Sequence, residues 1–231
     1  MDLGLSGRTA LVTGGDSGIG WHTARLLLEE GATVVLTDQD ADSLEQAAKE
    51  LDAPPGRLHT RAADLDTDEA ARSLAEFVRE AVGSLDVLVH SAGVTGATWK
   101  FHEIDDDGWV DTLTTDLLAP VRVTRAVLPL MRGRGWGRIV FLTSEDAVQP
   151  YDDELPYCAA KAGVQSFAKG LSQTYADEGI LVNCVAPAFI HTPMTDAMME
   201  QRAEEEGCSF DEAVESFLAE ERPHMELGRR G

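Results

Sequence analysis

Short apolar runs alternate with longer amphipathic stretches along most of the chain. The runs occupy residues 9–13, 33–37, 58–61, 85–90, 137–143 and 181–186. Most of them are dense in Val, Leu and Ile and lack the polar alternation of a strand with one solvent-exposed face. Continuous apolar runs of this length are typical of parallel strands that are buried on both faces. We therefore predict six parallel strands and interpret the first, at residues 9–13, as buried.

Helical stretches separate these strands. We place helices at residues 21–30, 41–51, 67–82, 109–131 and 157–178. Pro120 is a candidate for a bend in the fourth helix, because proline lacks a backbone donor. Regular alternation without a linker predicts one α/β domain over residues 1–231, with a Rossmann-like doubly wound parallel sheet in three layers (α/β/α). Such sheets bind ligands at the carboxyl ends of their strands.

A glycine-rich turn connects the first predicted strand to the first helix. Gly14, Gly18 and Gly20 permit a tight backbone path and the close approach of a pyrophosphate, which the helix N-terminus would stabilise. Their spacing differs from the commoner G-x-G-x-x-G, and a plain turn is the alternative. The residues that we expect to contact a nucleotide here are Gly14, Asp16, Ser17, Gly18, Ile19 and Gly20.

Asp38 follows the second strand, roughly 20 residues beyond the glycine turn, where a carboxylate can bind the ribose hydroxyls of NAD. The same charge would repel the 2′-phosphate of NADP. Arg and Lys, which would hold that phosphate, are absent from residues 14–20 and from positions 39 and 40. The sequence therefore favours NAD over NADP. Alternatively, Asp38 only begins a turn.

The third and fourth strands also end in residues that suit a cofactor. Asp64, which Leu65 follows, is placed to accept a hydrogen bond from an adenine amino group or to cap the next helix. His90 ends the fourth strand, and small residues that would let a cofactor pass close to the backbone come next. These small residues are Ser91, Ala92 and Gly93.

Tyr157 and Lys161 lie one helical turn apart, so on a helix they share a face. A free tyrosine has a pKa near ~10. A neighbouring ammonium lowers that pKa, and the pair can then move a proton on and off an alcohol oxygen. By itself this spacing also occurs in helices that have no catalytic role.

Taken together, these blocks resemble the short-chain dehydrogenase/reductase family, in its single-domain form. The resemblance extends from about residue 5 to the end of the sequence. It rests on the glycine turn 13–20, Asp64, residues 90–93, the set Ser144, Tyr157 and Lys161, and the stretch 187–192.

The resemblance implies a reversible hydride transfer between a nicotinamide cofactor and a secondary alcohol or ketone. Tyr157 is then the general acid or base, Lys161 lowers the tyrosine pKa and holds the nicotinamide ribose, and Ser144 binds the substrate oxygen. The family's threonine that contacts the nicotinamide carboxamide corresponds to Thr192. Pro187 and Ile190 precede it as further expected cofactor contacts.

The sequence departs from the family at two places near the expected site. Asp116 stands where the family has a catalytic asparagine that helps to hold a water for a proton relay. We still assign Asp116 to the catalytic group, but its negative charge would raise the pKa of Lys161 and oppose phenolate formation. His90 and Ser91 replace two amides, and we interpret His90 as a buried histidine satisfied by backbone groups.

Residues 188–226 are expected to form a substrate lid. Relatives usually continue beyond it with one more helix and strand, without which an edge of the sheet would lie bare. The lid carries apolar side chains at rough helical spacing, which predict either an apolar wall for a mid-sized apolar substrate or packing alone. They are Met194, Met198, Met199, Phe210, Phe217 and Met225.

Composition excludes several other classes of protein. Acidic residues outnumber basic ones 41 to 19, for a net charge of -22, which disfavours nucleic acid and anionic membranes as partners. No apolar run approaches the roughly 20 residues of a membrane span, and no signal peptide begins the sequence. We read the three separated cysteines as free thiols of a cytoplasmic protein and find no metal motif. They are Cys158, Cys184 and Cys208.

Three other functions fit many of the same residues. One is a nucleotide-binding regulator of this fold without turnover, and another is an NADP-linked ketoreductase. The third is an epimerase or dehydratase that keeps its nicotinamide bound, although such chains usually run longer. By the family resemblance, the helices at residues 109–131 and 157–178 would pair in a homodimer or homotetramer.

Overall fold

Six parallel strands form one sheet in the order β3-β2-β1-β4-β5-β6. The strands are β1 (Thr9–Thr13), β2 (Thr33–Asp38), β3 (Leu58–Ala62), β4 (Val87–His90), β5 (Gly137–Leu142) and β6 (Ile180–Val185). All six predicted strands are present, with ends that shift by a residue or two. β3 and β6 lie at the edges of the sheet and are partly exposed. The order reverses between β1 and β4, where Thr13 lies opposite His90. The carboxyl ends of these two strands form the switch point of the fold.

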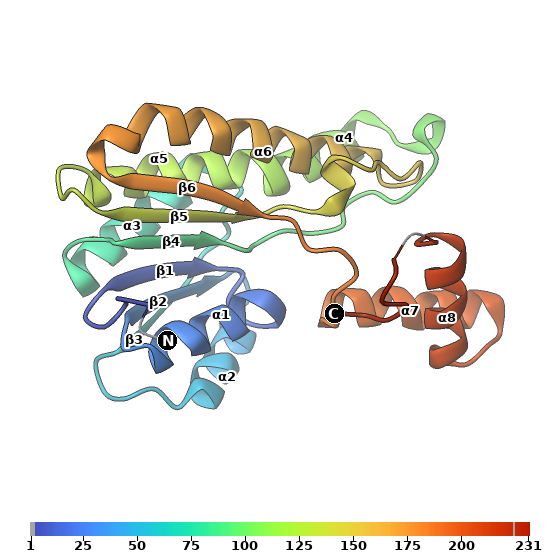
Figure 1. Ribbon diagram of the computed structural model, residues 1–231, viewed down its shortest axis with the longest axis horizontal. Coiled ribbons are helices and arrows are strands. Elements are labelled where there is room, and N and C mark those ends of the chain that lie inside the picture. The colour runs from blue at the N-terminus through green and yellow to red at the C-terminus, as the bar shows by residue number, and fades with distance from the viewer. Residues whose placement is uncertain (1–2, 224) are drawn as a thin grey trace. The chain divides into compact units, whose positions relative to one another are not determined.

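The computed structural model describes residues 3–223 and 225–231. The chain divides into two compact units, Met1–Ala186 and Pro187–Gly231. The sheet and its flanking helices lie in the first unit (Figure 1). These helices are α1 (Gly18–Glu29), α2 (Ala41–Leu51), α3 (Asp68–Val82), α4 (Asp106–Leu113), α5 (Ala119–Met131) and α6 (Leu155–Tyr175).

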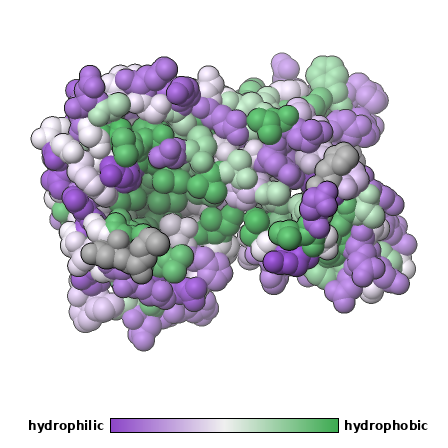
Figure 2. All heavy atoms as spheres, in the orientation of Figure 1, coloured by the Kyte–Doolittle hydropathy of each residue, from purple (hydrophilic) through white to green (hydrophobic). Residues whose placement is uncertain are grey.

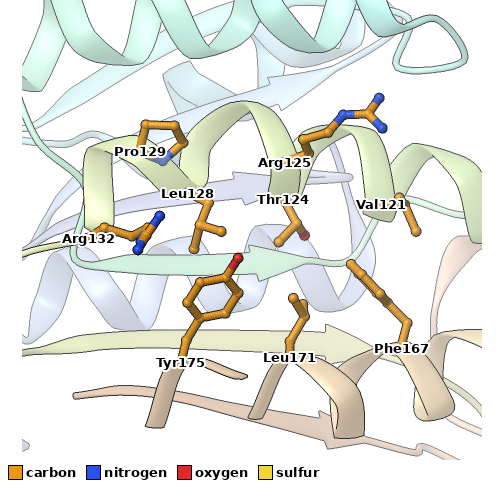
Figure 3. A pocket seen from close by; sticks show the side chains of 9 residues that line it. All are labelled: Val121, Thr124, Arg125, Leu128, Pro129, Arg132, Phe167, Leu171 and Tyr175. Atoms are coloured by element: carbon orange, nitrogen blue, oxygen red, sulfur yellow. The ribbon is translucent and has the colours of Figure 1, made fainter. Parts of the chain in front are cut away.

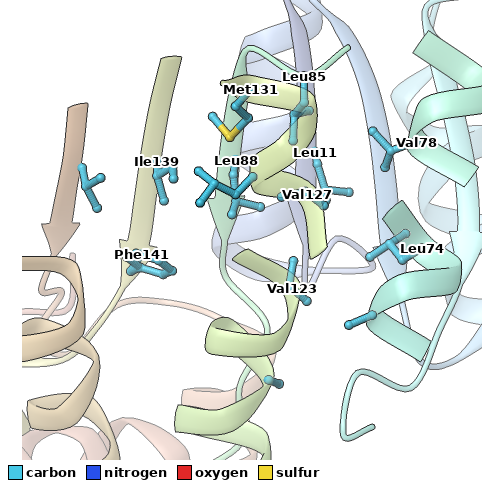
Figure 4. Close-up of a cluster of buried hydrophobic side chains, with 14 of the residues drawn as sticks. Leu11, Leu74, Val78, Leu85, Leu88, Val123, Val127, Met131, Ile139 and Phe141 are labelled. Carbon is cyan, nitrogen blue, oxygen red and sulfur yellow. The ribbon is translucent and has the colours of Figure 1, made fainter. Parts of the chain in front are cut away.

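Helices cover both faces of the sheet. One cluster of buried side chains joins α3, α5 and α6 to the sheet, and Figure 4 shows Leu11, Leu88 and Ile139 of three strands within it. A second cluster joins α1 and α2 to the opposite face, where Val12 packs. Successive strand residues point to opposite faces, so strands with two covered faces need continuous apolar runs. The predicted Rossmann-like, three-layer α/β fold is confirmed.

The predicted long helix at residues 109–131 is two α-helices joined by a π-helical turn. α4 ends at Leu113, the turn η2 (Thr114–Leu118) follows, and α5 begins at Ala119. The expected bend at Pro120 is therefore misplaced. The irregular hydrogen bonding precedes the proline, which sits in the first turn of α5, where a missing N–H is tolerated. Asp116 lies in this turn.

β6 forms one edge of the sheet. On the face of β5 and β6 opposite to α5 and α6, Val140 and Leu142 are partly buried and Val185 is 50% exposed. Figure 2 shows a hydrophobic area over β4, β5 and β6 on the visible side of the first unit. Only part of this face is covered by α1 and α2.

The second unit contains α7 (Pro193–Glu206) and α8 (Phe210–Glu220). They pack around Phe189, Met199 and Phe217, and the other apolar side chains named for this segment join the cluster, apart from the exposed Met194. Most of these side chains therefore pack against one another within the second unit, and packing of the lid onto the domain stays a prediction. A lid function for residues 188–226 stays a prediction. Across the described ranges, no helix is both long and apolar enough to traverse a bilayer.

Candidate active site

The four predicted catalytic residues come from three elements of the first unit. Asp116 lies in the π turn, Ser144 follows β5, and Tyr157 and Lys161 lie in the first turns of α6. Pro156 is the second residue of that helix, and its fixed φ suits the first turn. The elements bring all four side chains together.

Ser144 and Tyr157 are hydrogen bonded through their side chains. The Nζ atom of Lys161 lies 5.1 Å from the centroid of the Tyr157 ring. Ser144 and Lys161 are buried, and Tyr157 is half-buried. The sequence prediction that a hydroxyl, a phenol and an ammonium meet here agrees with this geometry.

Lys161 forms a buried ion pair with Asp116, with 2.9 Å between Nζ and Oδ1. The backbone N–H of Val94 donates to the same oxygen at 3.2 Å. Burial raises the pKa of the Asp116 carboxyl, and the Lys161 ammonium opposes that rise. The charge predicted near Lys161 is thus in direct contact with it.

Gly93 makes room for this ion pair. A Cβ atom at this position would lie 2.5 Å from Oδ1 of Asp116 and 2.9 Å from Nζ of Lys161. Both distances are shorter than real Cβ contacts, so a side chain here would displace the ends of the Asp116 and Lys161 side chains. Sequence reasoning assigned Gly93 only to cofactor contact.

The surroundings of Tyr157 differ from the prediction. Burial raises the pKa of the Tyr157 phenol, and the charges of Asp116 and Asp146 raise it further. The hydrogen bond with Ser144 acts in the other direction. The expected lowering of this pKa by Lys161 is therefore not found in the ligand-free chain, because burial and carboxylates outweigh the ammonium.

Asp146 is a site residue that the sequence did not reveal. The Ser144 hydroxyl donates to Oδ2 of Asp146 at 2.9 Å, and the Asp146 N–H donates to Oγ of Ser144 at 3.3 Å. Asp146 is only 5% exposed, although it lies in a stretch rich in acidic residues. The available signal was its position two residues after a serine, a spacing typical of side-chain turns.

The glycine turn has the geometry of a phosphate cradle. Gly14 and Gly18 have φ values of 66° and 52°, in the left-handed region. A Cβ on Gly20 would lie 1.9 Å from the carbonyl oxygen of Gly14, and one on Gly14 would lie 2.6 Å from the nitrogen of Ala92. The turn therefore packs backbone on backbone at the switch point and begins α1, as a dinucleotide requires.

Asp38 ends β2 beside the glycine turn. Its Oδ1 accepts the Gln39 N–H at 2.7 Å, and its carboxyl group is hydrogen bonded to Asp16. Burial raises the pKa of Asp38, and the charge of Asp16 raises it further. Two predicted cofactor residues thus form one acidic pair.

His90 is buried as predicted, but its partner is a side chain rather than the backbone. Nδ1 lies 3.1 Å from the Thr13 hydroxyl, which also accepts the N–H groups of Ser91 and Ala92. The hydroxyl has one hydrogen left to donate, so donation from the hydroxyl to Nδ1 is the arrangement that this geometry favours. Burial and the charge of Lys161 lower the pKa of His90 to about 3, which keeps the ring neutral.

The remaining predicted cofactor residues are placed as follows. Asp64 accepts the N–H of Asp66 at 3.0 Å, and the cap of α3 is Thr67, so the capping interpretation of Asp64 is wrong. The Leu65 side chain is buried in the core. Ser17 is the first residue before α1, and Ile19 lies in its first turn.

Three predicted cofactor contacts, Pro187, Ile190 and Thr192, lie in the second unit, and their roles stay predictions. Thr192 caps α7 by accepting the Thr195 N–H. In the ranges 3–223 and 225–231, no group of three or more His, Cys, Asp or Glu side chains is arranged to hold a metal ion.

Known proteins share this arrangement of elements. A nodulation protein G from Rhizobium sp. (strain N33) is 37% identical over 200 residues, which are 87% of this chain and 80% of that protein. A 2-dehydro-3-deoxy-L-rhamnonate dehydrogenase (NAD(+)) from Sphingomonas sp. (strain SKA58) is 34% identical over 86% of this chain and 78% of that protein.

The structure of L-sorbose reductase from Gluconobacter frateurii, in complex with NADPH and L-sorbose, superposes with a TM-score of 0.92 and 32% identity. The superposition covers 100% of this chain and 87% of that one. Residues 8–203 match the family described as short chain dehydrogenase. The chain belongs to the short chain dehydrogenase family.

Proposed function

We propose that this protein is an NAD-dependent oxidoreductase that interconverts a secondary alcohol and a ketone on a mid-sized, largely apolar small molecule. The observation that carries the proposal is the meeting of Ser144, Tyr157 and Lys161 at the end of β5 and the start of α6. Interconversion of a ketone and an alcohol requires a group that transfers a proton to or from the substrate oxygen and a second group that binds this oxygen as charge develops on it. A phenol and a hydroxyl can fill these two roles.

The protein's own groups handle the proton and the substrate oxygen. A bound nicotinamide dinucleotide would supply the hydride for reduction or accept it in oxidation. Tyr157 gives a proton to the substrate oxygen in reduction and takes one in oxidation. Ser144 binds that oxygen as charge develops on it, and Lys161 holds the ribose.

The binding site for the dinucleotide would run along the switch point. The residues that we assign to it are Gly14, Asp16, Ser17, Gly18, Ile19, Gly20, Asp38, Asp64, Leu65, His90, Ser91, Ala92, Gly93, Tyr157, Lys161, Pro187, Ile190 and Thr192. The glycine turn supports this assignment, because its backbone lies too close to neighbouring backbone for side chains.

The pair of Asp16 and Asp38 supports NAD as the cofactor. One carboxylate can bind the ribose hydroxyls, and two would repel a 2′-phosphate strongly. The Sphingomonas relative is named for NAD(+), whereas the sorbose reductase was crystallised with NADPH. An NADP-linked ketoreductase is therefore the second candidate.

We also infer a cytoplasmic homodimer or homotetramer. A groove of about 500 Å³ lies between α5 and α6. Figure 3 shows Leu128 on one helix facing Leu171 and Tyr175 on the other. Two long helices that present apolar side chains along a shared groove suit the pairing expected from the family.

Turnover assays test the function directly. Purified protein would be incubated with a panel of ketones with NADH or NADPH, and of secondary alcohols with NAD or NADP, while nicotinamide absorbance is followed. We expect turnover with apolar members of the panel and a preference for NAD. Dinucleotide binding without turnover on any member would favour the non-catalytic regulator.

A further inference from the structure

The carboxylate of Asp116 lies buried against the ammonium of Lys161. The side chain of Asp116 is 0% exposed and that of Lys161 is 6% exposed, so water does not separate or screen them. Oδ1 is shared by Lys161 and the Val94 N–H. Among the described residues, Oδ2 has no hydrogen-bond donor.

The groups that face this pair are mostly anionic. The charge of Asp66 raises the pKa of Asp116, and the charge of Lys161 lowers the pKa of His90, which is neutral. Three carboxylates raise the pKa of Tyr157 by their charge. Asp116 lies in the π turn, Asp146 lies in the segment after β5, and Glu154 directly precedes α6. Lys161 lies against the ring of Tyr157, and the hydroxyl hydrogen of Ser144 is donated to Asp146.

This arrangement changes what the lysine can do for the tyrosine. A lone ammonium would favour the phenolate, but an ammonium paired with a carboxylate at 2.9 Å is close to neutral when seen from the phenol. The phenol of Tyr157 therefore keeps its proton over a wider pH range than it would with an amide at position 116.

We propose that Asp116 is a positioning residue that holds Lys161 and keeps Tyr157 in its phenol form to higher pH, which is the form that protonates the substrate oxygen in carbonyl reduction. The proposal rests on the proposed function. For each carbonyl reduced, the carbon gains a hydride from the reduced dinucleotide and the C=O π bond breaks. The oxygen takes one proton from Oη of Tyr157, which solvent then replaces.

The charge effect is measured first without a cofactor. Tyr157 is replaced by a fluorinated tyrosine whose phenol is much more acidic, and its titration is followed by ¹⁹F NMR in the ligand-free protein. In an otherwise native chain and in Asp116→Asn, we expect midpoints that differ by about 1 pH unit, lower in the variant. Asp111→Asn is the matched control, because it removes an equal charge from the exposed side of α4.

Equal midpoints in the native background and Asp116→Asn, or a higher midpoint in the variant, would overturn the proposal. A comparable fall in Asp111→Asn would also overturn it, since the effect would then be general. Circular dichroism verifies folding, and Asp116→Ser provides a second way to remove the charge if the asparagine variant does not fold.

The pH dependence of turnover provides the second readout. In Asp116→Asn, kcat/KM for alcohol oxidation is expected to increase with pH at a midpoint about 1 pH unit lower than in the native protein. In the same variant, kcat/KM for ketone reduction should begin to fall at a correspondingly lower pH. An unchanged profile would contradict the proposal. Absence of turnover in every protein would refute the proposed function, while the ¹⁹F titrations would still decide the role of Asp116.

Discussion

At the scale of single residues, contacts decide what each side chain can do. Sequence motifs correctly brought Ser144, Tyr157 and Lys161 to one place, because their spacing is set by β5 and α6. They did not reveal that Asp146 is buried or that Thr13 is the partner of His90, because burial and contacts between residues distant in sequence are set by the fold. The pKa of Tyr157 was mispredicted for the same reason.

Asp38 provides a prediction at this scale. Asp38→Ala removes the proposed ribose contact and one of two charges that oppose a 2′-phosphate. We expect the ratio of kcat/KM values for NAD over NADP to fall roughly tenfold or more, the equivalent of one hydrogen bond to a charged group. Asp42→Ala, which removes an exposed acid at the start of α2, should leave the ratio within twofold of wild type. An unchanged ratio in Asp38→Ala would refute the ribose contact.

At the scale of elements, the sequence predicted which helices and strands are present better than it predicted the residues at which they begin and end. The helix over residues 41–51 matches α2, because Asp40 provides a clear cap. The π turn between α4 and α5 was missed, since nothing in local composition distinguishes it from a regular turn. Its consequence is functional, because it sets the position of Asp116.

The cap of α3 provides the prediction at the element scale. Thr67 accepts the N–H of Ala70 at 3.1 Å. Thr67→Ala should lower the free energy of unfolding by about 1 kcal/mol, because it leaves that N–H without its partner. Urea denaturation gives this value. Glu76→Ala, at an exposed position of the same helix, should change it by less than about 0.5 kcal/mol. Equal effects of the two substitutions would argue against the capping role.

At the scale of the molecule, the alternation of strands and helices along the chain was predictable, because the inner strands of a parallel sheet need helices on both faces. The order of the strands within the sheet was not predicted. The division into the units Met1–Ala186 and Pro187–Gly231 was not predicted beyond the suggestion of a lid. The groove between α5 and α6 also became visible only in three dimensions, because its lining comes from separate helices.

Assembly provides the prediction at this scale. Light scattering should give the mass of a dimer or tetramer for the native protein. Leu171→Arg, which puts a charge into the α5–α6 groove, should yield monomers because desolvating that charge is costly. Gln173→Arg adds the same charge at an exposed position of α6 outside the groove lining and should not alter the mass. A monomeric native protein would contradict pairing through this groove.

The most direct measurement for the whole account is turnover by Tyr157→Phe, with dinucleotide affinity determined in parallel by calorimetry. Removing one oxygen atom deletes the proton donor and keeps the ring that Lys161 contacts. The account predicts that kcat falls by at least about 10²-fold, while affinity for NAD stays within a few-fold of the native value. Near-native turnover in this variant would show that the proton reaches the substrate by another route.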